Sequence, residues 1–97
     1  MKVLKKIVFC KDCACCPTGE KLSNGKIRLK DDFGHEIIIP KEYFISVVKV
    51  GAEVFMEKTK DGQFFIIKDL WRKDKPFIKI TGEQLEIIRD LGKELLS

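Results

Sequence analysis

Hydrophobic and polar residues alternate over much of the chain with the two-residue period of half-buried β-strands. The clearest case is residues 26–30, where Ile27 and Leu29 share one face and three basic residues occupy the other. A run of turn-forming residues follows, and residues 35–39 predict the return strand of a hairpin. Pro40 ends that strand, because proline has no N–H to donate to a strand ladder.

The same reasoning predicts several further strands, at residues 3–9, 44–50, 52–59, 64–68 and 77–80. Residues 52–59 and 64–68 flank a Lys-Asp-Gly turn and predict a second hairpin. Gly and Pro residues punctuate residues 10–25, which we therefore expect to form an irregular loop or arm. Residues 70–76 are polar and predict another loop.

One helix is expected, at the C-terminal end, over residues 81–96. Thr81 is its predicted N-cap, and Gln84 completes a capping box. Gly92 would weaken the helix slightly. Hydrophobic residues recur at helical spacing and are expected to contact the core: Leu85, Ile88, Leu91 and Leu95.

These elements predict an α+β fold with a β majority. About six short antiparallel strands would form a rolled sheet or small barrel, closed at one open end by the C-terminal amphipathic helix. The length of 97 residues fits a single domain, residues 1–97.

Composition and charge indicate a well-solvated protein. Hydrophobic residues make up 44% of the chain and charged residues 35%, and no apolar run approaches the length of about 18 that a spanning helix needs. We therefore expect a cytoplasmic protein with no membrane contact. The net charge of +4 is concentrated in residues 1–25, where five lysines face Asp12 and Glu20. This bias is typical of a solubilising surface or of binding to an anionic partner.

All four cysteines lie within seven residues: Cys10, Cys13, Cys15 and Cys16. In a reducing cytoplasm, clustered thiols bind metal or carry out redox chemistry more often than they form disulfides. The spacing of the first two suits one zinc ion. The last two are adjacent, so three cysteines with His35 as a remote ligand, or two chains of a homo-oligomer sharing an ion, are easier arrangements than four local ligands.

Three alternatives remain for the cysteines. An iron–sulfur cluster also needs thiolates, but the spacing does not match the ferredoxin pattern. A thiol redox enzyme or sensor would use the Cys-x-x-Cys form, with Lys11 favouring the thiolate. The third alternative is ordinary cysteines, some of them paired as disulfides.

A second cluster interleaves an aromatic residue with basic ones: Trp71, Arg72, Lys73 and Lys75. Such surfaces stack bases and neutralise phosphates of single-stranded nucleic acid. The alternative is that Trp71 and the neighbouring phenylalanines simply pack in the core.

Motifs of catalysis are missing from the sequence, which has one histidine, no Gly-rich phosphate loop and no nucleophile elbow. We therefore expect a small binding or regulatory module rather than an enzyme. Its favoured function is to hold zinc in the cysteine loop and to recognise a protein or nucleic acid. The second hypothesis is a β-barrel that binds single-stranded nucleic acid, and the third is the thiol redox protein.

Overall fold

The structure is a computed structural model that describes residues 2–9, 17–49 and 51–96. Its elements, in chain order, are β1 (Val3–Val8), β2 (Thr18–Leu22), β3 (Ile27–Lys30), β4 (Glu36–Ile39), helix α1 (Lys41–Val47), 3₁₀-helix η1 (Ala52–Phe55), β5 (Glu57–Lys58), β6 (Phe64–Lys68), β7 (Phe77–Thr81), helix α2 (Gly82–Gly92) and 3₁₀-helix η2 (Lys93–Leu96).

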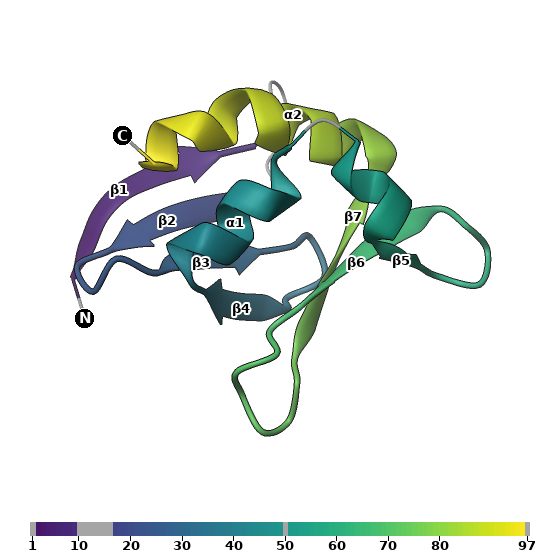
Figure 1. The fold of residues 1–97 in the computed structure, drawn as a ribbon, viewed down its shortest axis with the longest axis horizontal. Coiled ribbons are helices and arrows are strands. Elements are labelled where there is room, and N and C mark those ends of the chain that lie inside the picture. The colour runs from purple at the N-terminus through teal and green to yellow at the C-terminus, as the bar shows by residue number, and fades with distance from the viewer. Residues whose placement is uncertain (1, 10–16, 50, 97) are drawn as a thin grey trace.

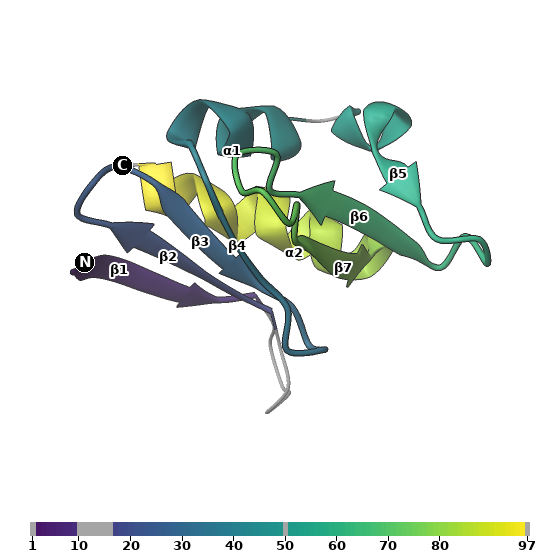
Figure 2. The ribbon, with the colours of Figure 1, turned by 90° about the horizontal axis from the view of Figure 1, so that it is seen from below.

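The strands form two antiparallel sheets, which confirms the α+β class and the C-terminal helix. Sheet A has the order β1-β2-β3-β4 and sheet B the order β5-β6-β7. They remain separate and do not close, so the predicted small barrel is wrong. Helix α2 and η2 extend from β7 to the β1–β2 side of sheet A (Figure 1). Seen from below, α2 runs behind the region where the two sheets meet, and α1 lies above it (Figure 2).

The hairpin of β3 and β4 forms as the alternation predicts. Ile27 pairs with Ile39, and Leu29 pairs with Ile37. These four side chains are buried in a core to which both sheets and both α-helices contribute. Among the described residues, we find no helix that is long and apolar enough to cross a membrane.

Strand β2 corrects the prediction of an irregular loop over residues 10–25. Residues Thr18–Leu22 form a strand that pairs with both β1 and β3. Gly19 lowers the β-propensity of this segment, so propensity alone does not predict the strand. The packing nevertheless requires a residue as small as glycine here. A Cβ atom there would lie 2.7 Å from both Phe9 and Leu95. The glycine thus lets Phe9 and the end of the C-terminal helix approach the sheet.

Helix α1 corrects the strand predicted over residues 44–50. The chain is helical from Lys41 to Val47, with Pro40 as the extended residue before it. Phe44 and Val47 are buried, three residues apart on one helical face. Burial of this face outweighs the β-preference of the Ile and Val residues nearby. The strand expected over residues 52–59 likewise shrinks to β5, preceded by η1.

Helix α2 begins as predicted. The Thr81 hydroxyl accepts a hydrogen bond from the Gln84 N–H at 3.1 Å, and the Gln84 side chain accepts one from the Thr81 N–H at 3.0 Å. Gly92 has a packing role, because a Cβ there would lie 2.8 Å from the Phe44 ring. The C-terminal hydrophobic stripe contacts the core as expected, with Leu85, Ile88 and Leu95 buried and Leu91 partly buried.

Two buried carboxylates join the sheets. Asp31, in the turn between β3 and β4, accepts a hydrogen bond from the main-chain N–H of Lys79 in β7 at 2.9 Å. Asp69, directly after β6, accepts one from the main-chain N–H of Ile38 in β4 at 3.2 Å. Each sheet thus supplies a carboxylate to a main-chain N–H of the other, which fixes β4 against β7.

Candidate functional site

The predicted thiolate ligands Cys10, Cys13, Cys15 and Cys16 lie outside the described residues. The structure does describe the two residues that flank them. Phe9, which is fully buried, donates its main-chain N–H to the carbonyl oxygen of Pro17 at 2.9 Å. Val8 pairs with Thr18 immediately below. The residues directly before and after the cysteine-bearing segment, Phe9 and Pro17, are therefore joined by a hydrogen bond.

The turn that carries His35 lies at this same end of sheet A. Thr18 pairs with Lys30, so the start of β2 adjoins the end of β3, and the β3–β4 turn follows directly. In that turn, the His35 Nδ1 atom lies 3.0 Å from Asp31 Oδ2, and 45% of the His35 side-chain area is exposed. A carboxylate beside Nδ1 favours the tautomer whose Nε2 carries no hydrogen and is free to bind a metal.

Described residues alone do not make a metal centre. No group of three or more His, Asp or Glu side chains within residues 2–9, 17–49 and 51–96 is placed to hold an ion. The Asp31 carboxylate holds the His35 ring at Nδ1, so this pair offers one candidate ligand atom, His35 Nε2.

The loop between β6 and β7 holds the predicted basic and aromatic cluster. Its base is closed by a hydrogen bond from the Asp69 N–H to the Pro76 carbonyl at 2.8 Å, and the buried Asp69 side chain also accepts from the Trp71 N–H at 3.1 Å. Lys75 has a φ of 46°, the left-handed region that side chains rarely adopt. The loop thus has a defined shape despite its polar sequence.

Trp71 is a surface residue rather than a core one, with 55% of its area exposed. Its ring meets Tyr43 edge to face, with centroids 5.3 Å apart. The structure brings the predicted basic residues together with it on one exposed loop: Arg72, Lys73 and Lys75. An indole held on one side and open on the other can stack against a planar ligand.

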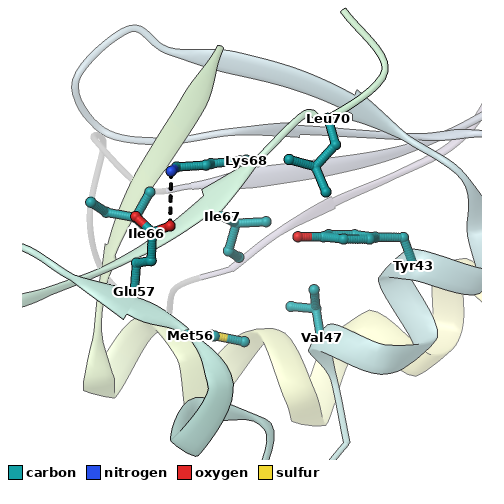
Figure 3. Close-up of a pocket in the computed structure, with 8 residues that line it drawn as sticks. All are labelled: Tyr43, Val47, Met56, Glu57, Ile66, Ile67, Lys68 and Leu70. Atoms are coloured by element: carbon teal, nitrogen blue, oxygen red, sulfur yellow. Dashed lines mark hydrogen bonds and ion pairs between the residues drawn. The ribbon is translucent and has the colours of Figure 1, made fainter. Parts of the chain in front are cut away.

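A groove beside this loop lies between α1, Met56 and strand β6. One cavity of about 170 Å³ has the Tyr43 ring projecting across it, with the hydroxyl toward Ile67 (Figure 3). A second hollow of about 200 Å³ adjoins it and shares Tyr43, Val47 and Met56. Each is smaller than the 300–1,000 Å³ of typical small-molecule sites, which argues against a cofactor-sized ligand here.

Burial and two neighbouring charges shift the pKa of Tyr43 at this groove. Lys68 Nζ donates to Glu57 Oε1 at 2.8 Å at the rim of the cavity (Figure 3). Burial raises the pKa of Tyr43 above its ordinary value, the negative charge of Glu57 raises it further, and Lys68 opposes the change. The Tyr43 hydroxyl therefore stays protonated at neutral pH and can act as a hydrogen-bond donor.

Sequence reasoning missed the contribution of Tyr43, because the β-branched residues nearby predict a strand over residues 44–50 rather than a helix that includes Tyr43. The helical signal was present. Phe44, Val47 and Val48 are buried and Tyr43 is half-buried, a spacing of three and four residues that defines one helical face.

Comparisons with protein-family models, with curated proteins and with solved structures find no match to this chain.

Proposed function

We propose that the protein is a small non-enzymatic binding module of a reducing cytoplasm, which holds a zinc ion on thiolates drawn from Cys10, Cys13, Cys15 and Cys16, with His35 as a remote ligand. The observation that carries this proposal is the Asp31–His35 pair at the end of sheet A from which the cysteine segment departs. Zinc-binding histidines commonly have a carboxylate or carbonyl at their second ring nitrogen, which fixes the ring and its tautomer.

Ligand number also supports this arrangement. Adjacent Cys15 and Cys16 are poorly suited to bind one tetrahedral ion together, so a remote fourth ligand relieves the constraint. His35 supplies an imidazole from a turn next to the anchor of the segment. The described residues already form a core to which both sheets and both α-helices contribute, so we expect the fold to persist without the metal.

Elemental analysis of protein purified without oxygen tests the proposal. We expect one zinc per chain, or one per two chains if two copies share the ion. Replacement of all four cysteines by serine should abolish zinc binding and leave the far-ultraviolet circular dichroism unchanged. His35→Gln should lower the affinity for zinc, measured by competition with a chromophoric chelator. Wild-type protein without stoichiometric metal would overturn the proposal.

The same preparation separates the two other thiol chemistries. Stoichiometric iron together with visible absorption would indicate that the cysteines hold an iron–sulfur cluster instead of zinc. A metal-free protein in which one thiol alkylates much faster than the rest at neutral pH would support the redox alternative, because a low thiol pKa increases the thiolate fraction.

A second candidate function is binding of single-stranded nucleic acid by the β6–β7 loop. The observation that favours it is the exposure of Trp71 beside Arg72, Lys73 and Lys75 on a loop of fixed shape. An exposed indole stacks on bases, and the three cations neutralise phosphates. Asp74 is the only acid in the exposed part of the loop, residues 70–75.

Trp71 is the only tryptophan, so its fluorescence reports on the loop alone. An oligothymidine titration at low salt should quench it. If three phosphates are contacted, the logarithm of the association constant should fall with that of the salt concentration with a slope of about −2. Replacing each loop cation by glutamine should reduce the slope by about 0.7. Lys26→Gln, in the exposed turn before β3, is the matched control. Unchanged fluorescence at low salt would contradict this function.

A further inference from the structure

Sheet B presents an exposed aromatic surface on the side away from the core. Along β7, Ile78 and Ile80 are buried, so Phe77, Lys79 and Thr81 point the other way. Phe64 pairs with Thr81 and lies on the same outer face. Phe77 retains 38% of its area exposed. An apolar ring at this position contributes little to the core.

The β3–β4 turn adds another ring to this surface. Phe33 is 49% exposed and meets Phe64 edge to face, with centroids 5.4 Å apart. The Lys79 ammonium lies 4.5 Å from the Phe33 centroid and 5.4 Å from that of Phe64. Phe33, Phe64, Phe77 and Lys79 are called the aromatic face below. It combines π surfaces and a cation without an acidic residue among its members.

Buried Asp31 holds the two parts of the aromatic face together. Its carboxylate accepts hydrogen bonds from the main-chain N–H groups of Phe33 and Lys79, each at 2.9 Å. The His35 ring, oriented by the same carboxylate, stacks on Phe77 with centroids 5.6 Å apart. The exposed rings are therefore pre-positioned by a fully buried group, which lowers the entropy lost when a ligand binds.

The aromatic face is continuous with the β6–β7 loop. Phe77 follows Pro76, which closes the base of that loop, and it pairs with Lys68. Beside it lies a hollow of about 340 Å³ at the β3–β4 turn, lined by Lys30, His35 and Glu36 among others. Cations thus flank the rings at both ends, on the loop and at Lys79.

We propose that the aromatic face stacks unpaired bases of single-stranded nucleic acid, with Lys79 neutralising a phosphate. The inference rests on the second proposed function for its class of partner but assigns a different surface. Rings on an open sheet face, interleaved with cations, are the arrangement that single-strand-binding modules use, because every base has a π-face to stack. The positive charge of Lys79 and of the adjoining loop complements the phosphate chain.

Fluorescence anisotropy of a labelled twelve-residue oligothymidine tests the aromatic face. Phe33→Leu with Phe77→Leu removes the rings and keeps apolar volume, and we expect affinity to fall roughly tenfold. Lys79→Gln should also weaken binding while its main-chain bond to Asp31 remains. Lys58→Gln is the matched control, because Lys58 Nζ lies 5.1 Å from the Phe65 ring in a similar pair outside the aromatic face.

The outcomes separate this inference from the proposed function of the loop. Binding that survives the face variants and is lost in Trp71→Leu overturns the aromatic face and leaves the loop. Binding lost in the face variants and retained in Trp71→Leu supports the face and overturns the loop. Failure of the wild type to bind at low salt overturns both. A dimer that the face variants dissociate, with oligonucleotide affinity unchanged, shows a second copy as the occupant and also overturns the inference.

Discussion

The side-chain carboxylate of Asp31 accepts a hydrogen bond at 2.9 Å from the main-chain N–H of Lys79, which lies 48 residues further along the chain. The same buried carboxylate accepts from the N–H groups of Phe33 and His35. One side chain therefore shapes a turn, joins two sheets and orients a histidine. Two of the surfaces proposed to bind ligands depend on it.

Asp31→Asn is expected to lower the free energy of unfolding by about 2 kcal/mol. The amide keeps one acceptor oxygen but turns an NH₂ group toward N–H donors, and a buried donor without a partner is costly. Chemical denaturation measures the change. Asp32→Asn is the control, since Asp32 is exposed and accepts a hydrogen bond from the Gln84 side chain. An equal effect of both variants would contradict the role assigned to Asp31.

Gly92→Ala and Gly82→Ala should act in opposite directions. Helix propensity alone favours alanine at both positions by up to about 1 kcal/mol. At Gly92 the new methyl group would lie 2.8 Å from Phe44, and overpacking should lower the free energy of unfolding by about 1–3 kcal/mol. At Gly82 the nearest atom, in Phe65, is 3.6 Å away, so stability should rise slightly. Thermal unfolding of both variants compares the two effects.

The contrast between α2 and α1 shows how much of the fold the sequence could predict. The capping box of Thr81 and Gln84 is local, so it defines the start of α2 without tertiary information. Helix α1 has no side-chain cap, and its identity depends on burying Phe44 against Gly92 and the rest of the core. Strand β2 likewise depends on its neighbours, because Gly19 is favourable only where Phe9 and Leu95 approach.

Lys75→Gly should separate stability from binding. A left-handed residue with a side chain costs roughly 1 kcal/mol that glycine avoids, so the free energy of unfolding should rise by up to about that amount. Lys73→Gly removes the same charge without this relief. If the loop binds nucleic acid, both variants should weaken binding, but only Lys75→Gly should raise the melting temperature. A melting temperature lowered equally by both would contradict the strain at Lys75.

Tyr43 is the only tyrosine, so the absorbance of tyrosinate gives its titration directly. We expect a midpoint above the ordinary value of 10.0, because burial and the charge of Glu57 both favour the protonated hydroxyl. Its contribution to stability is present below pH 10 and is lost as the pH rises through the pKa of the folded protein. Glu57→Gln should lower the midpoint, and Lys68→Gln should raise it. No difference between these variants would contradict the assigned causes.

For the candidate sites, the sequence predicted individual residues with unusual chemistry. It did not predict surfaces that form only when strands pair. The cation-rich loop around Trp71 is contiguous in the chain and was found as such. The aromatic face is assembled from β6, β7 and a turn 48 residues before Lys79. Phe64 and Phe77 lie in hydrophobic strand runs, where a half-exposed ring cannot be told from a core ring without the register.

The exchange of carboxylates between the sheets has a dynamic consequence. Because Asp69 accepts the N–H of Ile38 and Asp31 accepts that of Lys79, neither sheet can open without releasing a donor bound by the other. Both amides should therefore exchange with deuterated solvent only through global unfolding, with matching free energies of opening. The chain would then have no partly open native form in which sheet B separates from sheet A, and any ligand must be accepted by a scaffold that moves as one body.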